Sequence, residues 1–80
     1  MKIPVIKKLV ETYTLEQLVA AEAAMMEEQA PAIEVQGDDE GEKLTHVLAA
    51  VWVKGEINTN GTEAMTAIRA YAQRVRNSIS

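Results

Sequence analysis

The sequence predicts a small, mainly α domain of four helices with one short extended segment, at about residues 32–36, between the second and third helices. Apolar side chains recur at the three- and four-residue spacing of helices along most of the chain. Pro and Gly divide this pattern into separate segments. Eighty residues is the size of one domain, so residues 1–80 are expected to form a single helical domain.

The first two predicted helices have recognisable start signals. One covers about residues 4–12 and begins at Pro4, whose missing N–H would have no partner in a first helical turn anyway. The next covers about residues 15–29 and follows Thr14, which has the pattern of a capping box with the glutamine three residues later. Pro31 is expected to end this helix, because proline disfavours the helical conformation of the residue before it.

The segment at residues 32–36 alternates apolar and polar side chains, which is typical of a half-buried extended stretch. It could pair with the chain start or with a second copy as a strand. It could equally be a loop that is anchored by Ile33 and Val35. Gly37 closes the segment in either arrangement.

The third predicted helix covers about residues 39–54 and is apolar on nearly all sides, which is typical of a buried central helix. Acidic residues at its start complement the helix dipole, and Gly55 is expected to end it as a left-handed cap. Residues 58–61 predict a turn, and the fourth helix covers about residues 61–79. The expected core combines the large apolar residues of these two helices: Leu44, Val47, Leu48, Val51, Trp52, Ile68, Tyr71 and Val75.

Charge and composition narrow the class of protein. The net charge is −4, and residues 34–42 contain five acidic residues and no basic one, whereas both ends of the chain are basic. The absence of Cys excludes a disulfide-braced scaffold and suits a reducing interior. No run approaches the ~20 apolar residues of a membrane span. We therefore expect a cytoplasmic protein without a membrane partner.

The residue types that make nucleophiles, proton shuttles and metal cages are scarce. The chain has no Cys, one His, and only two Ser, both at its C-terminus. Asp38, Glu42 and His46 are spaced by four and could share a helix face, but three weak ligands without a further His or Cys make a poor metal site. The simpler interpretation is that the acids cap a helix. We predict no enzymatic activity, no metal and no cofactor.

Glu22 lies in the middle of the apolar stripe of the second helix and is a possible buried charge. A carboxylate there needs a partner. That partner could be an Arg or Lys from another helix, or the site could lie at the rim of the core under a partner subunit. A single carboxylate without companions does not make an active site.

Surplus apolar surface predicts a non-enzymatic interaction module that self-associates. The third helix offers more apolar surface than three short neighbours are expected to cover. Met25 and Met26 add adaptable surface of the kind used in contacts, and Val53 is expected to join them. The partner would be a second copy or another protein, and ordinary core packing is the alternative use of these residues.

A basic edge on the last helix supplies the alternative function. Arg69, Gln73 and Arg76 line this edge, with Arg74 on the far side of the helix. Such an edge can bind nucleic acid or another anionic ligand. The acidic net charge and the lack of an aromatic stacking platform make nucleic acid the less favoured partner.

The two ends of the chain resemble those of a family of short bacterial proteins of unknown function. Residues 1–8 (MKIPVIKK) and residues 73–79 (QRVRNSI) carry this resemblance, and residues 40–46 (EGEKLTH) are similar to some members. The likeness spans nearly the whole chain and implies a stand-alone bacterial intracellular domain. These motifs have no known chemical role, so the resemblance assigns no functional residue.

Overall fold

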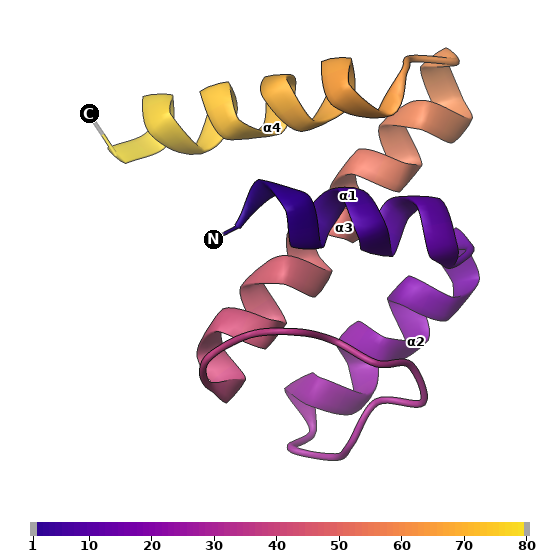
Figure 1. Cartoon of the computed structure of the whole chain (residues 1–80), viewed down its shortest axis with the longest axis vertical. Helices are drawn as coiled ribbons and strands as arrows, with labels where there is room; N and C mark the ends of the chain where they lie inside the picture. The colour runs from indigo at the N-terminus through magenta and orange to yellow at the C-terminus, as the bar shows by residue number, and fades with distance from the viewer. Residues whose placement is uncertain (1, 80) are drawn as a thin grey trace.

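The computed structural model describes residues 2–79, and within them the chain forms four helices and no strand, which confirms the mainly α fold class. The helices are α1 (Ile3–Thr12), α2 (Leu15–Met26), α3 (Glu40–Asn60) and α4 (Ala64–Ile79). The long α3 packs against each of the other three, and α4 also packs against α1 (Figure 1). None of the helices in this described part of the chain is long and apolar enough to cross a membrane.

The ends of α1 are fixed by a proline and by a lysine from another helix. Pro4 lies in the first turn, as predicted. At the other end, the Lys54 Nζ of α3 donates a hydrogen bond of 3.0 Å to the Val10 carbonyl. This carbonyl belongs to the last turn, where helix carbonyls have no partner within their own helix, and a cation there also complements the helix dipole. Lys54 thereby ties the end of α1 to the middle of α3.

The predicted capping box of α2 is confirmed. The Gln17 N–H donates to Thr14 Oγ1 at 3.2 Å, and the Thr14 N–H donates to Gln17 Oε1 at 2.9 Å. Both bonds connect residues that are three apart in the sequence, so this start signal depends on local sequence alone.

The end of α2 lies earlier than predicted, at Met26 instead of Gln29. The Gln29 N–H returns to the Ala24 carbonyl at 2.8 Å, which is the long bond of a Schellman motif. Glu28 occupies the left-handed position of this motif, with φ of 61°, where glycine is usual. The hydrogen bonds of the motif therefore end the helix before Pro31 can act.

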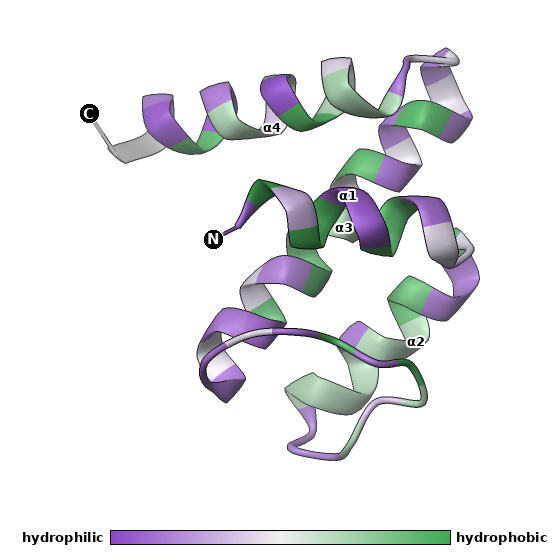
Figure 2. Ribbon diagram, viewed as in Figure 1, coloured by the Kyte–Doolittle hydropathy of each residue, from purple (hydrophilic) through white to green (hydrophobic). Residues whose placement is uncertain are grey.

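The linker between α2 and α3, residues 27–39, crosses from the end of one helix to the start of the other (Figure 1). Residues 32–36, for which the sequence allowed either a strand or a loop, form a loop. Val35 is buried and Ile33 is half-buried against the core. Figure 2 shows green, apolar stretches of this linker between purple, polar ones. Two apolar side chains thus anchor the loop.

The predicted end of α3 at Gly55 is wrong, because the helix continues through Gly55 to Asn60. Glycine in a helix interior costs only about 1 kcal/mol relative to alanine, and the extra turn packs Ile57 against the core. Gly61 is the left-handed cap instead, with φ of 65° and an N–H that donates to the Ile57 carbonyl at 2.8 Å. The fourth helix consequently begins at Ala64.

The start of α3 is closely enclosed by the linker. Asp39 caps the helix by accepting a 2.8 Å hydrogen bond from the Glu42 N–H, as expected for acidic residues at this end. Just before it, a Cβ at Gly37 would lie 2.9 Å from the Lys43 backbone N and 2.8 Å from its Cγ. The linker backbone therefore passes so near the first turn of α3 that only glycine fits at residue 37.

We expect Gly37→Ala to lower the free energy of unfolding by about 1–3 kcal/mol, because the added methyl group forces the linker away from α3. The matched control is Gly41→Ala, compared at a concentration where the protein is monomeric; its Cβ would be 3.4 Å from Asp39 Oδ1, an ordinary contact. Urea unfolding followed by circular dichroism measures both variants. Equal stability of Gly37→Ala and the wild type would contradict the close approach.

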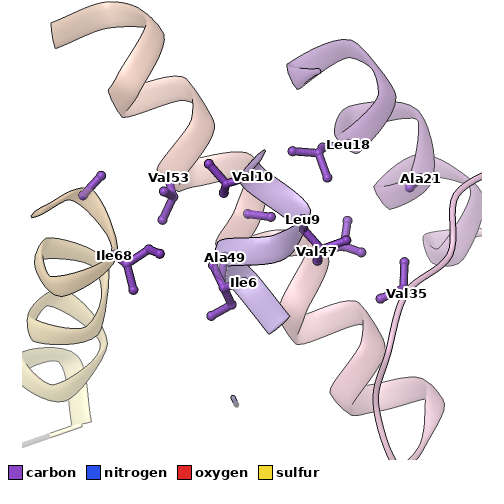
Figure 3. Close-up of a cluster of buried hydrophobic side chains, with 12 residues drawn as sticks. Ile6, Leu9, Val10, Leu18, Ala21, Val35, Val47, Ala49, Val53 and Ile68 are labelled. Atoms are coloured by element: carbon purple, nitrogen blue, oxygen red, sulfur yellow. The ribbon is translucent and has the colours of Figure 1, made fainter. Parts of the chain in front are cut away.

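The core lies where α1, α2 and α4 meet around α3, and Figure 3 shows side chains from all four helices and from the linker in it. Val47 and Ile68 are buried, as predicted, but Leu48 is 39% exposed, so its placement in the core was wrong. Leu44, Val51, Trp52, Tyr71 and Val75 are only half-buried. The buried hydrophobic residues are Ile6, Leu9, Val10, Leu18, Ala21, Val35, Val47, Ala49, Ala50, Val53, Ala67 and Ile68.

The most buried side of α3 is its small-residue side. Ala49, Ala50 and Val53 are each 0% exposed. Small side chains let neighbouring helices approach the α3 backbone closely, and α3 must contact three helices at once. On the opposite side of α3, Leu48 is exposed and Leu44, Val51 and Trp52 are only half-buried, so the most buried side is not the one that the sequence pattern suggested.

Candidate interaction surface

The side of α3 that faces away from Ala49 and Val53 carries large apolar side chains. Residues 44, 48, 51 and 52 share one helix face because they are spaced by three and four. Leu48 at its centre is 39% exposed, and the others are half-buried. We call this set the outer face of α3: Leu44, Leu48, Val51 and Trp52.

The C-terminal end of the outer face lies beside α4. The Trp52 ring packs on Tyr71 with a centroid distance of 5.6 Å and an interplanar angle of 49°. The Arg74 guanidinium lies over the Trp52 ring, 5.9 Å from its centroid. α4 therefore places a positive charge at this end of the outer face.

The N-terminal end of the outer face is acidic. The side chains of Glu40 and Asp38 are 85% and 78% exposed. Lys43 Nζ lies 3.5 Å from Glu40 Oε1, and Lys2 Nζ lies 3.5 Å from Asp38 Oδ1. Exposed pairs of this kind contribute about 0–1 kcal/mol and are screened by salt, so Glu40 remains available to a stronger partner.

The end of α2 and the start of α3 enclose a surface hollow of about 420 Å³. It is lined by Met25, Glu28, Gln29, Ala30 and Glu40, which combine an apolar side chain with two acidic ones. This combination suits a side chain with an apolar stem and a cationic head. The second hollow, between α1 and the linker, has a volume of about 40 Å³, which is room for a few water molecules.

His46 is fully buried and both of its ring nitrogens are in use. Nδ1 lies 2.8 Å from the Gln36 carbonyl and must donate to it, because a carbonyl can only accept. Nε2 then accepts a 2.9 Å hydrogen bond from the Lys2 N–H. His46 thus connects the chain start, the linker and α3, and neither nitrogen is left for a metal. Within residues 2–79, no group of His, Cys, Asp or Glu is arranged to hold a metal ion.

Glu22 is half-buried on α2, so it is not the buried charge that the sequence suggested. Among the described residues its side chain has no hydrogen bond or ion pair. Because Glu22 is still partly exposed, water can hydrate its carboxylate. The Arg or Lys partner that the sequence suggested is therefore not needed. Glu22 lies between Val19 and Met26, which are 47% and 64% exposed.

The other predicted surface residues do not form one patch. Val53 is 0% exposed and belongs to the core, so it is not a surface contact. Met25 packs partly on the core, whereas Met26 is largely exposed. The three residues of the basic edge are exposed on α4, and Arg74 projects separately over Trp52. They are Arg69, Gln73 and Arg76.

Sequence reasoning missed the outer face because it counted large apolar residues as core. A usable signal was present: the pair Ala49–Ala50 marks the side of α3 on which other helices can approach closely. No local signal could have placed Arg74 over Trp52, because these residues belong to different helices.

Comparison with known proteins identifies a family but no characterised relative. The model of a family of unknown function, DUF6952, matches residues 1–80. No curated protein matches the chain, and no solved structure matches it. A function must therefore be argued from the surface itself.

Proposed function

The chain belongs to the DUF6952 family of unknown function, and we propose that it is a non-enzymatic interaction module that self-associates through the outer face of α3. The observation that carries this proposal is Leu48, which is 39% exposed in the middle of a continuous apolar helix face. Covering this face would remove several large side chains from water, at about 25 cal/mol per Å² of apolar area. An 80-residue domain with few aromatic residues gains much from such burial.

Several features support contact over catalysis. The one histidine has both ring nitrogens engaged by backbone groups. The hollow beside α1, at about 40 Å³, is far below the several hundred Å³ typical of small-molecule sites. The residues that line the larger hollow include two glutamates but no His, Cys, Ser, Thr or Lys.

The outer face of α3 is favoured over the exposed stripe of α2. Val19 and Met26 are more exposed than Leu48, but Glu22 lies between them. A partner covering that stripe would bury a carboxylate without an ionic partner, which costs several kcal/mol. The outer face of α3 has its charges at the two ends instead of the middle.

A cytoplasmic location and a protein partner are part of the same proposal. The cysteine-free composition suits a reducing compartment. Nucleic-acid binding through the basic edge of α4 is less favoured than a protein partner. Arg74 lies over Trp52, away from Arg69 and Arg76, and the chain is acidic overall.

We expect Leu48→Glu to weaken self-association by about tenfold or more, because burying an unpaired charge costs at least ~1.4 kcal/mol. Size-exclusion chromatography with light scattering measures the mass at matched concentrations. Val19→Glu is the control, because it adds the same charge at a similarly exposed valine on α2. A Leu48→Glu variant that associates as well as the wild type would contradict the proposal, and loss in Val19→Glu alone would move the contact to α2.

A further inference from the structure

Building on the proposed self-association, we infer how the two copies are arranged: their α3 helices pack antiparallel about a twofold axis at Leu48, and Arg74 of each copy pairs with Glu40 of the other. The pairing follows from the placement of apolar and charged side chains along the outer face.

Three residues of the outer face, Leu44, Leu48 and Trp52, are spaced symmetrically about Leu48. Leu44 and Trp52 each lie four residues from Leu48, about 6 Å along the helix axis. In a twofold contact the same surface is used by both copies, so an antiparallel pair centred on Leu48 places Leu44 against Trp52 of the partner subunit. Leu48 then packs on its own symmetry mate. Leu44, Leu48 and Trp52 thus meet large apolar side chains, and Val51 meets Thr45 of the partner subunit.

Two glycines mark the ends of this contact. Gly41 and Gly55 each lie seven residues from Leu48, and the same symmetry places one against the other. A Cβ at Gly55 would meet nothing within 4 Å inside the chain, so the domain's own packing gives no reason for glycine in this helix interior. A close helix crossing between copies supplies that reason, because the missing side chain lets the partner's backbone approach.

The charges select the antiparallel orientation. Glu40 is one turn before Leu44 on the same side of α3, and its side chain is 85% exposed. Arg74 lies over Trp52 at the other end, 5.9 Å from the ring centroid. Antiparallel packing brings each Arg74 to the partner's Glu40. Parallel packing would instead place like charges together at both ends, which disfavours association.

The hollow beside Glu40 gives the arginine a place to bind. It is lined by Met25 and by a second carboxylate, that of Glu28, and its volume of about 420 Å³ exceeds that of one side chain. The stem of the arginine would lie on Met25 while its guanidinium reaches the carboxylates. Met25 then contributes to the contact through this hollow.

The first experiment reverses the charges. Arg74→Glu and Glu40→Arg should each weaken self-association by about tenfold or more, as measured by sedimentation equilibrium, and the double variant should recover it because both pairs re-form with opposite sign. Arg76→Glu is the matched control, because it is an exposed arginine on the outward edge of α4. Circular dichroism checks that each variant is folded. Failure of the double variant to recover would overturn the pairing.

The second experiment tests orientation with single cysteines, which the cysteine-free chain makes unambiguous. Leu48→Cys should cross-link to a dimer on mild oxidation, since the two residues meet at the axis. Glu40→Cys should not, because antiparallel packing separates the two copies of residue 40 by about 24 Å, far beyond disulfide reach. Cross-linking of both variants would indicate parallel packing and overturn the arrangement while leaving self-association standing. A monomeric wild type would overturn both.

Discussion

Ile6→Ala is expected to lower the free energy of unfolding by about 3–4 kcal/mol, among the largest losses from core truncation in this chain. Ile6 is 0% exposed and lies in the core among residues of α3 and α4 (Figure 3). Removing its side chain loses the transfer free energy and leaves a cavity that three packed helices cannot close. Because a domain of this size is stable by only ~4–12 kcal/mol, much of the population would unfold at physiological temperature.

Urea unfolding, followed by circular dichroism and by Trp52 fluorescence, measures this loss. Val19→Ala is the control, because Val19 is 47% exposed and its truncation is expected to cost well under 1 kcal/mol. If Ile6→Ala were as stable as the control, Ile6 could not be at the centre of the core.

The second large effect is expected from His46→Leu, which should lower the free energy of unfolding by about 2–4 kcal/mol. Leucine preserves apolar volume at a fully buried position, but it removes both hydrogen bonds of the imidazole. The Lys2 N–H and the Gln36 carbonyl then lose their partners, and each orphaned group costs about 1–3 kcal/mol. The loss should concentrate at the chain start and the linker.

Amide hydrogen exchange distinguishes this local effect from a general loss of packing. Exchange at Lys2 should accelerate more in His46→Leu than in Ile6→Ala when the two are compared at equal global stability. His46→Gln keeps a donor and an acceptor and should recover part of the stability. Unchanged stability in His46→Leu would show that the two hydrogen bonds contribute nothing.

The parts of the fold that depend on neighbouring residues could be predicted from the sequence. The Thr14–Gln17 capping box connects residues three apart and was expected, and acidic residues were expected at the start of α3, where Asp39 is the cap. The four helices followed from apolar spacing for the same reason. Local sequence is sufficient where the stabilising bonds are themselves local.

The errors occurred where distant contacts decide between local alternatives. Gly55 and Gly61 carry the same local signal for a helix end, and only the packing of Ile57 against the core shows that the helix continues to the second. His46 looked like a weak metal ligand because its two partners, the Lys2 N–H and the Gln36 carbonyl, are 44 and 10 residues away. Val53 looked like a surface contact because the large apolar residues of α3 suggested the wrong buried side, and only the pair Ala49–Ala50 indicated the correct one.

The sequence could predict that the third helix has surplus apolar surface, but not which side of the helix carries it. Surplus apolar area on the third helix was expected, and α3 does leave Leu48 39% exposed. Which side chains are exposed depends on which side the other helices occupy, and the charge beside Trp52 depends on how α4 folds back. Both are properties of tertiary packing.

Sedimentation equilibrium of the wild-type protein over a wide range of concentrations tests the proposed self-association most directly. The monomer mass is 8.8 kDa. We expect the weight-average mass to rise with concentration toward twice that value, and added salt to shift the equilibrium back toward the monomer because the Arg74–Glu40 pairs are screened. A mass that stays at 8.8 kDa at every concentration and ionic strength would contradict self-association through the outer face of α3.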